Sequence, residues 1–180
     1  MTAPTPEPQI ADAALLPEPF SGWFLSRGWT PRPHQLDLLA HARAGRSALL
    51  IAPTGAGKTL AGFLPSLIDL AGEKKRRNAL TREGPHTLYI SPLKALAVDI
   101  ARNLEAPVAE MGLPITVETR TGDTPVNRRQ RQKRIPPDIL LTTPEQVALL
   151  LADRQADRLF SELEVVVLDE LHALVTSKRG

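Results

Sequence analysis

The sequence predicts an α/β domain in which a parallel sheet is covered by helices on both faces. Three observations support this fold class. Short apolar runs alternate with helical patterns along the chain, which is typical of strand–helix–strand units. A glycine-containing loop at residues 52–59 follows one apolar run and precedes a helical pattern. An acidic pair, Asp169 and Glu170, ends another run, as expected at the carboxyl edge of a parallel sheet.

The composition suits one ordinary domain. The chain has 180 residues, enough for a sizeable core, and it has no cysteine, which excludes disulfides and thiolate metal sites. Its net charge of +2 gives no global argument for nucleic acid. No signal peptide is recognisable and no run approaches the ~20 apolar residues of a membrane span. We therefore expect a cytoplasmic protein without a membrane partner.

The chain divides into a leader and a domain. Residues 1–19 contain five prolines among small residues, and we interpret them as a flexible leader. Residues 20–180 form the predicted domain. Basic residues gather at 74–77 and at 128–134, and each cluster is either a solvated surface or a site for phosphates.

The first half of the domain contains two predicted helices and one predicted strand. A helix is expected over 32–44, with Pro33 in its first turn and Gly45 as its C-terminal cap. Residues 47–51 are apolar and predict a buried strand that leads into the glycine-containing loop. A second helix is expected from Lys58 to about residue 71, with a loop over 72–85.

The second half continues the alternation. Leucine and isoleucine recur at helical spacing between residues 93 and 104, and Asp123 begins a helix-start signal for a polar surface helix that ends near 134. Thr143 and Gln146 predict a capping box. The strands are expected at 87–90, 115–118, 138–142 and 164–168, the last being apolar enough for burial on both faces.

The loop at 52–59 has the residue types that hold a triphosphate. Backbone N–H groups at a helix N-terminus supply donors and a favourable dipole, and glycine allows the chain to approach closely. Lys58 would reach the β- and γ-phosphates and Thr59 would bind Mg²⁺. Ala52 stands where the general pattern has glycine. The predicted nucleotide-binding residues of this loop are Thr54, Gly55, Ala56, Gly57, Lys58 and Thr59.

The acidic pair supplies the second half of a hydrolytic site. Asp169 would complete the Mg²⁺ site, and Glu170 would orient the attacking water and accept its proton. On its own, such a pair could simply end a strand, but together with the loop it indicates an NTPase. His172 could cap the following turn, and with no second histidine or cysteine at zinc spacing a zinc site there is not predicted.

Several motifs in order resemble the first motor domain of a superfamily 2 DExH-box helicase. Beyond the loop and the acidic pair these are Gln35, Ser91–Leu96, Thr121–Asp123, Thr142–Glu145 and His172. Three stretches, at residues 120–124, 138–145 and 176–180, resemble more particularly the large helicase-related (Lhr) type and its DNA-ligase-associated subgroup. The resemblance covers about residues 20–180 and implies a RecA-like P-loop NTPase fold that works with ATP and Mg²⁺.

The resemblance also implies roles for single residues. Gln35 would read the adenine edge, Phe20, Trp29 or Arg32 would flank the base, and His172 would couple the nucleotide site to the nucleic-acid site. Without the resemblance, Gln35 is an ordinary helix residue and the threonines are helix caps. The residues expected against the nucleic-acid backbone are Pro92, Lys94, Ala95, Thr121, Gly122, Thr143 and Pro144.

The resemblance further implies partners. They are single-stranded or partly duplex DNA, with RNA and hybrids left open, and a functional link to a DNA ligase in DNA repair. A second RecA-like domain with transition-state arginines is expected in the full-length protein, so these 180 residues are expected to be an incomplete, weakly active part of it. The alternatives are a kinase, a GTPase, for which an Asn-Lys-x-Asp motif is missing, and a nucleic-acid-binding remnant without activity.

Overall fold

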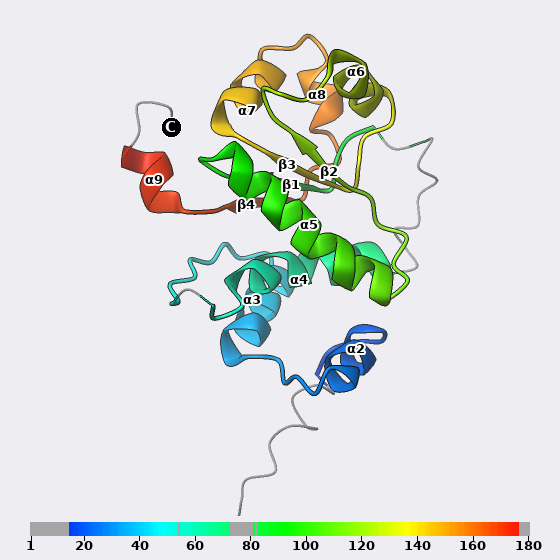
Figure 1. Ribbon diagram of the computed structural model, residues 1–180, viewed down its shortest axis with the longest axis vertical. Coiled ribbons are helices and arrows are strands. Elements are labelled where there is room, and N and C mark those ends of the chain that lie inside the picture. Colours follow the sequence, from blue (N-terminus) through cyan, green and yellow to red (C-terminus); the bar gives the residue numbers. More distant parts are fainter. Residues whose placement is uncertain (1–14, 54, 73–80, 82, 177–180) are drawn as a thin grey trace, which may run out of the picture. The chain divides into compact units, whose positions relative to one another are not determined.

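The computed structural model describes residues 15–53, 55–72, 81 and 83–176 (Figure 1). These residues divide into two units. The first comprises Met1–Ile68 with Glu110–Gly112, and the second comprises Asp69–Ala109 with Leu113–Gly180. Within the described residues, no helix is both long and apolar enough to cross a membrane.

The first unit is helical. It contains α2 (Phe20–Ser26), α3 (Pro33–Arg43) and all but the last three residues of α4 (Lys58–Ala71). The predictions of helices over 32–44 and 58–71 are thus confirmed, and Gly45 adopts the positive φ of +63° that a C-terminal cap requires. The largest fully buried side chains of α4 are those of Phe63, Leu64 and Leu67.

One prediction for this unit was wrong. Residues 47–51 form neither helix nor strand, and the side chains of Leu49 and Ile51 are 70% and 87% exposed. A strand exists only through pairing, and the described strands all pair with one another instead. Just before α2, Leu16 is buried and the Pro17 carbonyl accepts a hydrogen bond from the Phe20 N–H, and the extent of the predicted leader stays a prediction. Residues 1–14 lie outside the described part.

A parallel four-stranded sheet organises the second unit. Its strands are β1 (Thr87–Ile90), β2 (Val117–Arg120), β3 (Ile139–Thr142) and β4 (Val165–Leu168), in the order β2-β3-β1-β4. Four of the five predicted strands are therefore found. The strand predicted at 115–118 begins two residues later, because Thr116 and Asp138 hydrogen-bond through their side chains at the point where β2 and β3 start.

Helices cover both faces of this sheet, as predicted. They are α5 (Lys94–Glu110), α6 (Val126–Arg134), α7 (Pro144–Leu151) and α8 (Ala156–Leu159), and α9 (Leu171–Thr176) follows β4. The chain moves in one direction along the sheet from β1 through α5 to β2, and in the other direction from β2 through α6 to β3 and from β3 through α7 and α8 to β4. Because such connections are right-handed, α5 lies on one face of the sheet and α6, α7 and α8 lie on the other (Figure 1). On the α7–α8 face, Leu88 and Leu140 pack with Leu150 and Leu159.

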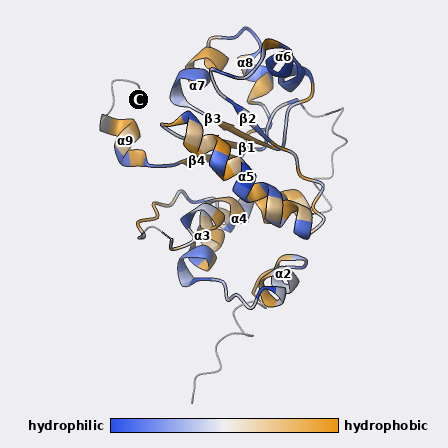
Figure 2. Ribbon diagram, viewed as in Figure 1, coloured by the Kyte–Doolittle hydropathy of each residue, from blue (hydrophilic) through white to orange (hydrophobic). Residues whose placement is uncertain are grey.

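The surface helix α6 agrees with its sequence pattern. It is the most hydrophilic helix by mean hydropathy among those described, and Figure 2 shows it in blue. Arg128 and Arg131 lie 3.5 and 2.5 Å from the carboxylate of Glu118, and Lys133 pairs with Asp153. Much of the basic cluster at 128–134 is thus neutralised by acids of its own unit, which favours the solvated interpretation of this segment.

Two finer predictions for the second unit were wrong. The strand β4 is not buried on both faces, since the side chains of Val166 and Leu168 are 51% and 49% exposed. The reason is that β4 is the end strand of the described sheet. Thr143 does stand at the N-cap of α7, but its side chain makes no capping hydrogen bond. The N–H of Gln146 donates to the Thr143 carbonyl at 3.0 Å instead, so it is not available to the Thr143 hydroxyl.

Candidate functional site

The glycine-containing loop has the backbone geometry that phosphate binding needs. Gly55 and Gly57 have φ angles of +79° and +73°, which side-chain-bearing residues rarely adopt. Lys58 follows as the first residue of α4, so its N–H and those after it lie in the first helical turn. Ala56 is held by a 3.2 Å hydrogen bond from its N–H to the Pro53 carbonyl. Thr54 lies outside the described residues.

Gln35 contacts this loop from α3. Its side chain is 97% buried, its Oε1 accepts a 2.8 Å hydrogen bond from the Arg32 N–H, and its Nε2 donates to the Gly57 carbonyl at 3.5 Å. A Cβ on Gly57 would lie 3.1 Å from this Nε2. Gln35 therefore joins the start of α3 to the phosphate loop. Its role toward a base stays a prediction, as does the choice among Phe20, Trp29 and Arg32.

In the second unit, four loops meet at the carboxyl edge of the sheet. The strands are in register, with Ile90 opposite both Thr142 and Leu168, and Arg120 opposite Thr142. The residues that follow the strands are thus aligned in the order of the strands. These residues are Thr121 after β2, Thr143 after β3, Ser91 after β1 and Asp169 after β4.

Asp169 is oriented by a buried tyrosine. The Tyr89 hydroxyl, from the neighbouring strand β1, donates to Asp169 Oδ2. Burial raises the pKa of Tyr89 well above its usual range, and the hydrogen bond to Asp169 and the negative charges of Asp169 and Glu170 raise it further. The phenol therefore remains a donor. A carboxylate held in this way and a threonine hydroxyl such as that of Thr59 are oxygen ligands of the kind Mg²⁺ prefers.

Glu170 has a strained backbone. Its φ of +47° makes it the one non-glycine residue with positive φ in the described part of the chain, a conformation found disproportionately at functional sites. It directly precedes α9, and its carbonyl accepts the Ala173 N–H at 2.7 Å. His172 Nδ1 lies 3.4 Å from Glu170 Oε2. Both residues predicted to act on the water and to couple the two sites are therefore neighbours in space.

The residues predicted to face nucleic acid lie at the same edge. Thr121 and Thr143 are buried, and the Thr121 N–H donates to the Thr124 hydroxyl oxygen at 2.9 Å, which shapes this turn. Lys94 Nζ, in the first turn of α5, lies 2.7 Å from Asp123 Oδ2 with both side chains exposed. Of the remaining predicted residues, Pro92 and Pro144 are partly buried and Ala95 and Gly122 are exposed.

Sequence reasoning missed two members of this edge. Tyr89 reads as a core residue in the sequence, and its contact with Asp169 joins residues 80 positions apart. Asp123 was noted as a helix-start signal and within the Thr121–Asp123 motif, but its pairing with Lys94 was not predicted. A signal was available for the tyrosine, since a lone polar hydroxyl on a buried strand usually finds a partner. The loop belongs to the first unit and Asp169 to the second.

Comparison with known proteins gives a family. A DEAD/DEAH box helicase family model matches residues 32–180. The chain is 44% identical to the Lhr helicase/probable uracil glycosylase of Mycolicibacterium smegmatis, over 88% of this chain and 11% of that protein. It is 41% identical to the Lhr helicase/uracil glycosylase of Escherichia coli, over 99% of this chain and 12% of that protein.

A solved structure shows the same fold. The structure of Mycobacterium smegmatis helicase Lhr bound to ssDNA and AMP-PNP matches with a TM-score of 0.75 and 41% identity. The match covers 88% of this chain and 21% of that one. The chain therefore spans about a tenth to a fifth of the length of these relatives, and the parallel sheet with helices on both faces is that of a RecA-like helicase domain.

Proposed function

Because this chain belongs to the DEAD/DEAH box helicase family, we propose that it is the ATP-binding motor part of an ATP-dependent helicase or translocase that acts on nucleic acid. The observation that carries the proposal is the edge of the sheet in the second unit. There a Tyr89-held aspartate and a strained glutamate lie in line with the loops after β1, β2 and β3.

The nucleotide is held by two groups of residues. In the proposed complex the N–H groups of residues 55–59 contact phosphate oxygens, and Lys58 neutralises their charge. Thr59 and Asp169 would hold Mg²⁺, which when bound neutralises charge on the phosphates. The glycine φ angles and the Tyr89 hydrogen bond support these assignments. Gln35 is proposed to bind the adenine edge and to couple this binding to the loop through its hydrogen bond to the Gly57 carbonyl.

Glu170 is proposed to position the attacking water and to accept its proton. His172, close to the Glu170 carboxylate, would transmit the state of this site to the nucleic-acid side. The positive φ of Glu170 supports a functional role, because such a conformation costs about 1–3 kcal/mol and persists where the surroundings determine it.

The nucleic acid is proposed to lie along the loops after β1, β2 and β3. Threonine hydroxyls and N–H groups at helix starts can contact phosphates without reading bases. Lys94 supplies a cation there. Single-stranded DNA is the substrate we propose first, since the Lhr relative has been solved with ssDNA. A role in DNA repair, in the cytoplasm and alongside a DNA ligase, is a further proposal that rests on the motif resemblance.

Binding measurements separate this proposal from its competitors. We expect the chain to bind a fluorescent ATP analogue in preference to GTP, and to bind single-stranded DNA. The Lys58→Ala variant should lose nucleotide binding and keep DNA binding. A preference for GTP would favour a GTPase. Nucleotide binding without any DNA binding would favour a small-molecule kinase. If Lys58→Ala complements a deletion strain fully in the context of the longer protein, the domain acts only as a nucleic-acid-binding module.

Glu170→Gln tests the assignment of the water-activating residue. In a longer protein that hydrolyses ATP, this substitution should lower kcat by at least about 10², since general bases contribute 10²–10⁴, while ATP affinity is kept. Glu105→Gln, which changes an exposed glutamate on α5, is the matched control. Unchanged turnover in the Glu170→Gln protein would remove Glu170 from the mechanism.

A further inference from the structure

His86 is fixed at the amino end of the sheet, opposite to the edge described above. It directly precedes β1, its N–H donates to the Asp138 carbonyl at 3.0 Å, and its carbonyl accepts the Glu164 N–H at 3.0 Å. Its side chain is only 7% exposed. The backbone of three strands therefore determines where this imidazole lies.

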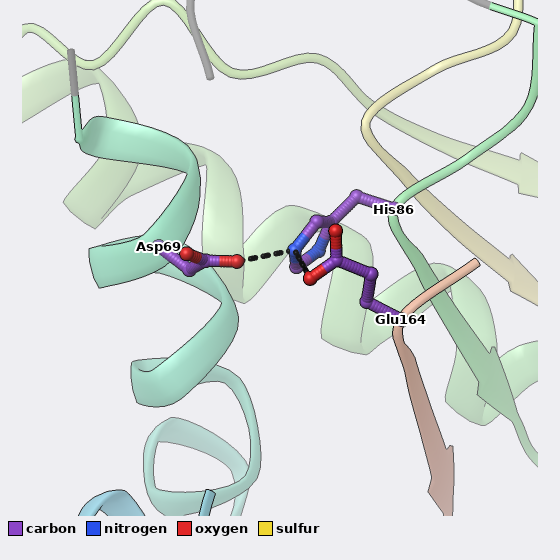
Figure 3. Close-up of side chains that lie close together, drawn as sticks. All are labelled: Asp69, His86 and Glu164. Carbon is purple, nitrogen blue, oxygen red and sulfur yellow. Dashed lines mark hydrogen bonds and ion pairs between the residues drawn. The ribbon is translucent and has the colours of Figure 1, made fainter. Parts of the chain in front are cut away.

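Two carboxylates converge on the same ring nitrogen. Asp69 Oδ2, from the last turns of α4, lies 2.6 Å from His86 Nε2, and Glu164 Oε2, directly before β4, lies 3.7 Å from it. Figure 3 shows both carboxylates directed at the imidazole. The three potential ligand atoms all lie within 4.8 Å of one another, and both carboxylates are reached by solvent.

The second ring nitrogen has a partner that suits metal ligation. His86 Nδ1 lies 2.8 Å from the hydroxyl of Thr87, which is fully buried. A hydroxyl both donates and accepts, so it can satisfy Nδ1 in either tautomer. When it accepts from Nδ1–H, the Nε2 lone pair points toward the two carboxylates. Metal-binding histidines usually have such an outer partner, which fixes the ring and the tautomer.

We propose that Asp69, His86 and Glu164 form a binding site for one divalent transition-metal ion of the Zn²⁺ type. Ligand bonds of about 2.0–2.2 Å place tetrahedral ligand atoms roughly 3.3 Å apart. The observed separations reach this spacing through small movements of two exposed carboxylates. One imidazole with two carboxylates suits Zn²⁺, whereas Mg²⁺ prefers oxygen ligands in an octahedron.

The site is separate from the proposed ATP–Mg²⁺ site. Glu164 precedes β4 and Asp169 follows it, so about 16 Å of extended chain lies between them. The three ligands come from α4, the start of β1 and the start of β4. A bound ion would therefore join the end of the helix that begins at the phosphate loop to two strands of the sheet, and would stabilise the folded chain.

Zinc titration of the 180-residue chain tests the proposal. We expect saturable binding of one Zn²⁺ per chain by calorimetry, with Mg²⁺ in excess, together with a rise in Tm and a shift of the His86 Nε2 resonance in histidine NMR spectra. Asp69→Asn and Glu164→Gln should each weaken Zn²⁺ binding at least about tenfold, the size of effect seen even for lost outer partners. Glu105→Gln and His172→Ala should leave the affinity unchanged.

The two carboxylate variants leave the buried imidazole of His86 unchanged and alter only exposed side chains, so they test the site without the risk of unfolding the chain. Absence of saturable binding would overturn the proposal. The same holds if binding is equally strong in both carboxylate variants, or if it disappears in His172→Ala. None of these readouts uses ATP, so failure here is distinguishable from failure of the proposed motor function.

Discussion

Tyr89 shows how one buried side chain supports the chemistry of a surface residue. It is the single tyrosine of the chain, and its ring lies in the core while its hydroxyl reaches Asp169 Oδ2. A carboxylate that accepts a fixed hydrogen bond has fewer orientations available to it. We infer that Tyr89 positions Asp169 for the metal ion. The sequence predicts the metal ligand Asp169 but gives no sign of its contact with Tyr89.

The raised pKa of Tyr89 predicts a loss of stability at alkaline pH. An unfolded tyrosine ionises near pH 10, whereas the folded phenol does not. The stabilising contribution is therefore complete below about pH 10 and falls as the pH rises above it toward the folded pKa. Absorbance near 295 nm should show no phenolate around pH 10 while circular dichroism remains native, and Tyr89→Phe should reduce the alkaline loss of unfolding free energy.

This titration has a clear contrary outcome. Since no other tyrosine contributes to the signal, a phenolate band that appears near pH 10 in the natively folded chain would show that the hydroxyl is not held by Asp169.

At the scale of elements, α4 and the loop before it form one structural unit for the proposed binding of phosphates. The positive φ of Gly57 turns the chain so that Lys58 begins the helix. Gln35 of α3 contacts the Gly57 carbonyl. The loop conformation is thus specified locally by glycine and supported by a residue 22 positions earlier.

Gly57→Ala should weaken nucleotide binding and stability. A left-handed alanine costs about 1–2 kcal/mol, and the added Cβ would press on Gln35 Nε2. We expect about that loss in urea unfolding, together with weaker ATP-analogue binding. Gly45→Ala is the matched control, because its φ is +63° with open space around it. It should lose similar stability and keep nucleotide affinity; equal loss of nucleotide affinity in both variants would contradict the local role of Gly57.

The loops that follow the four strands form a second structural unit, at the carboxyl edge of the sheet. Register places the residues after all four strands along one edge, and Lys94 pairs with Asp123 across two of these loops. A cation at this position would contact phosphates without distinguishing bases.

Lys94→Ala should weaken single-stranded DNA binding equally for different sequences. The slope of log affinity against log salt should fall by about 0.7 in magnitude, the value for one phosphate contact on a single strand. Fluorescence anisotropy over a salt series measures this slope. Arg102→Ala, an exposed substitution on the same helix, is the control. A sequence-dependent loss in Lys94→Ala would instead indicate base recognition.

At the scale of the whole molecule, the residues that we propose for nucleotide binding and hydrolysis are divided between the two units. Residues 55–59 belong to the first and Asp169 and Glu170 to the second. The proposed hydrolysis requires residues of both groups to contact one nucleotide. It also requires stabilisation of the charge that develops in the transition state. The family resemblance assigns that stabilisation to arginines of a second motor domain, and such arginines are worth about 10³–10⁵ in kcat.

The 180-residue polypeptide should therefore bind ATP–Mg²⁺ weakly and hydrolyse it poorly. Phosphate release with and without single-stranded DNA measures this, and a longer version of the protein that hydrolyses ATP serves as the positive control. Robust DNA-stimulated turnover by the 180 residues alone would show that the residues present here suffice.

The sequence alone determined the fold class, the glycine-containing loop before α4, four strands and most helices, because these depend on local periodicity, caps and glycine conformations. It also placed the predicted Thr121, Thr143 and Asp169 at strand ends. The tertiary structure alone decided strand order, the state of residues 47–51 and the contacts of Asp169 with Tyr89, Gln35 with Gly57 and Asp69 with His86. These depend on pairing between residues far apart in the chain, which no local pattern encodes.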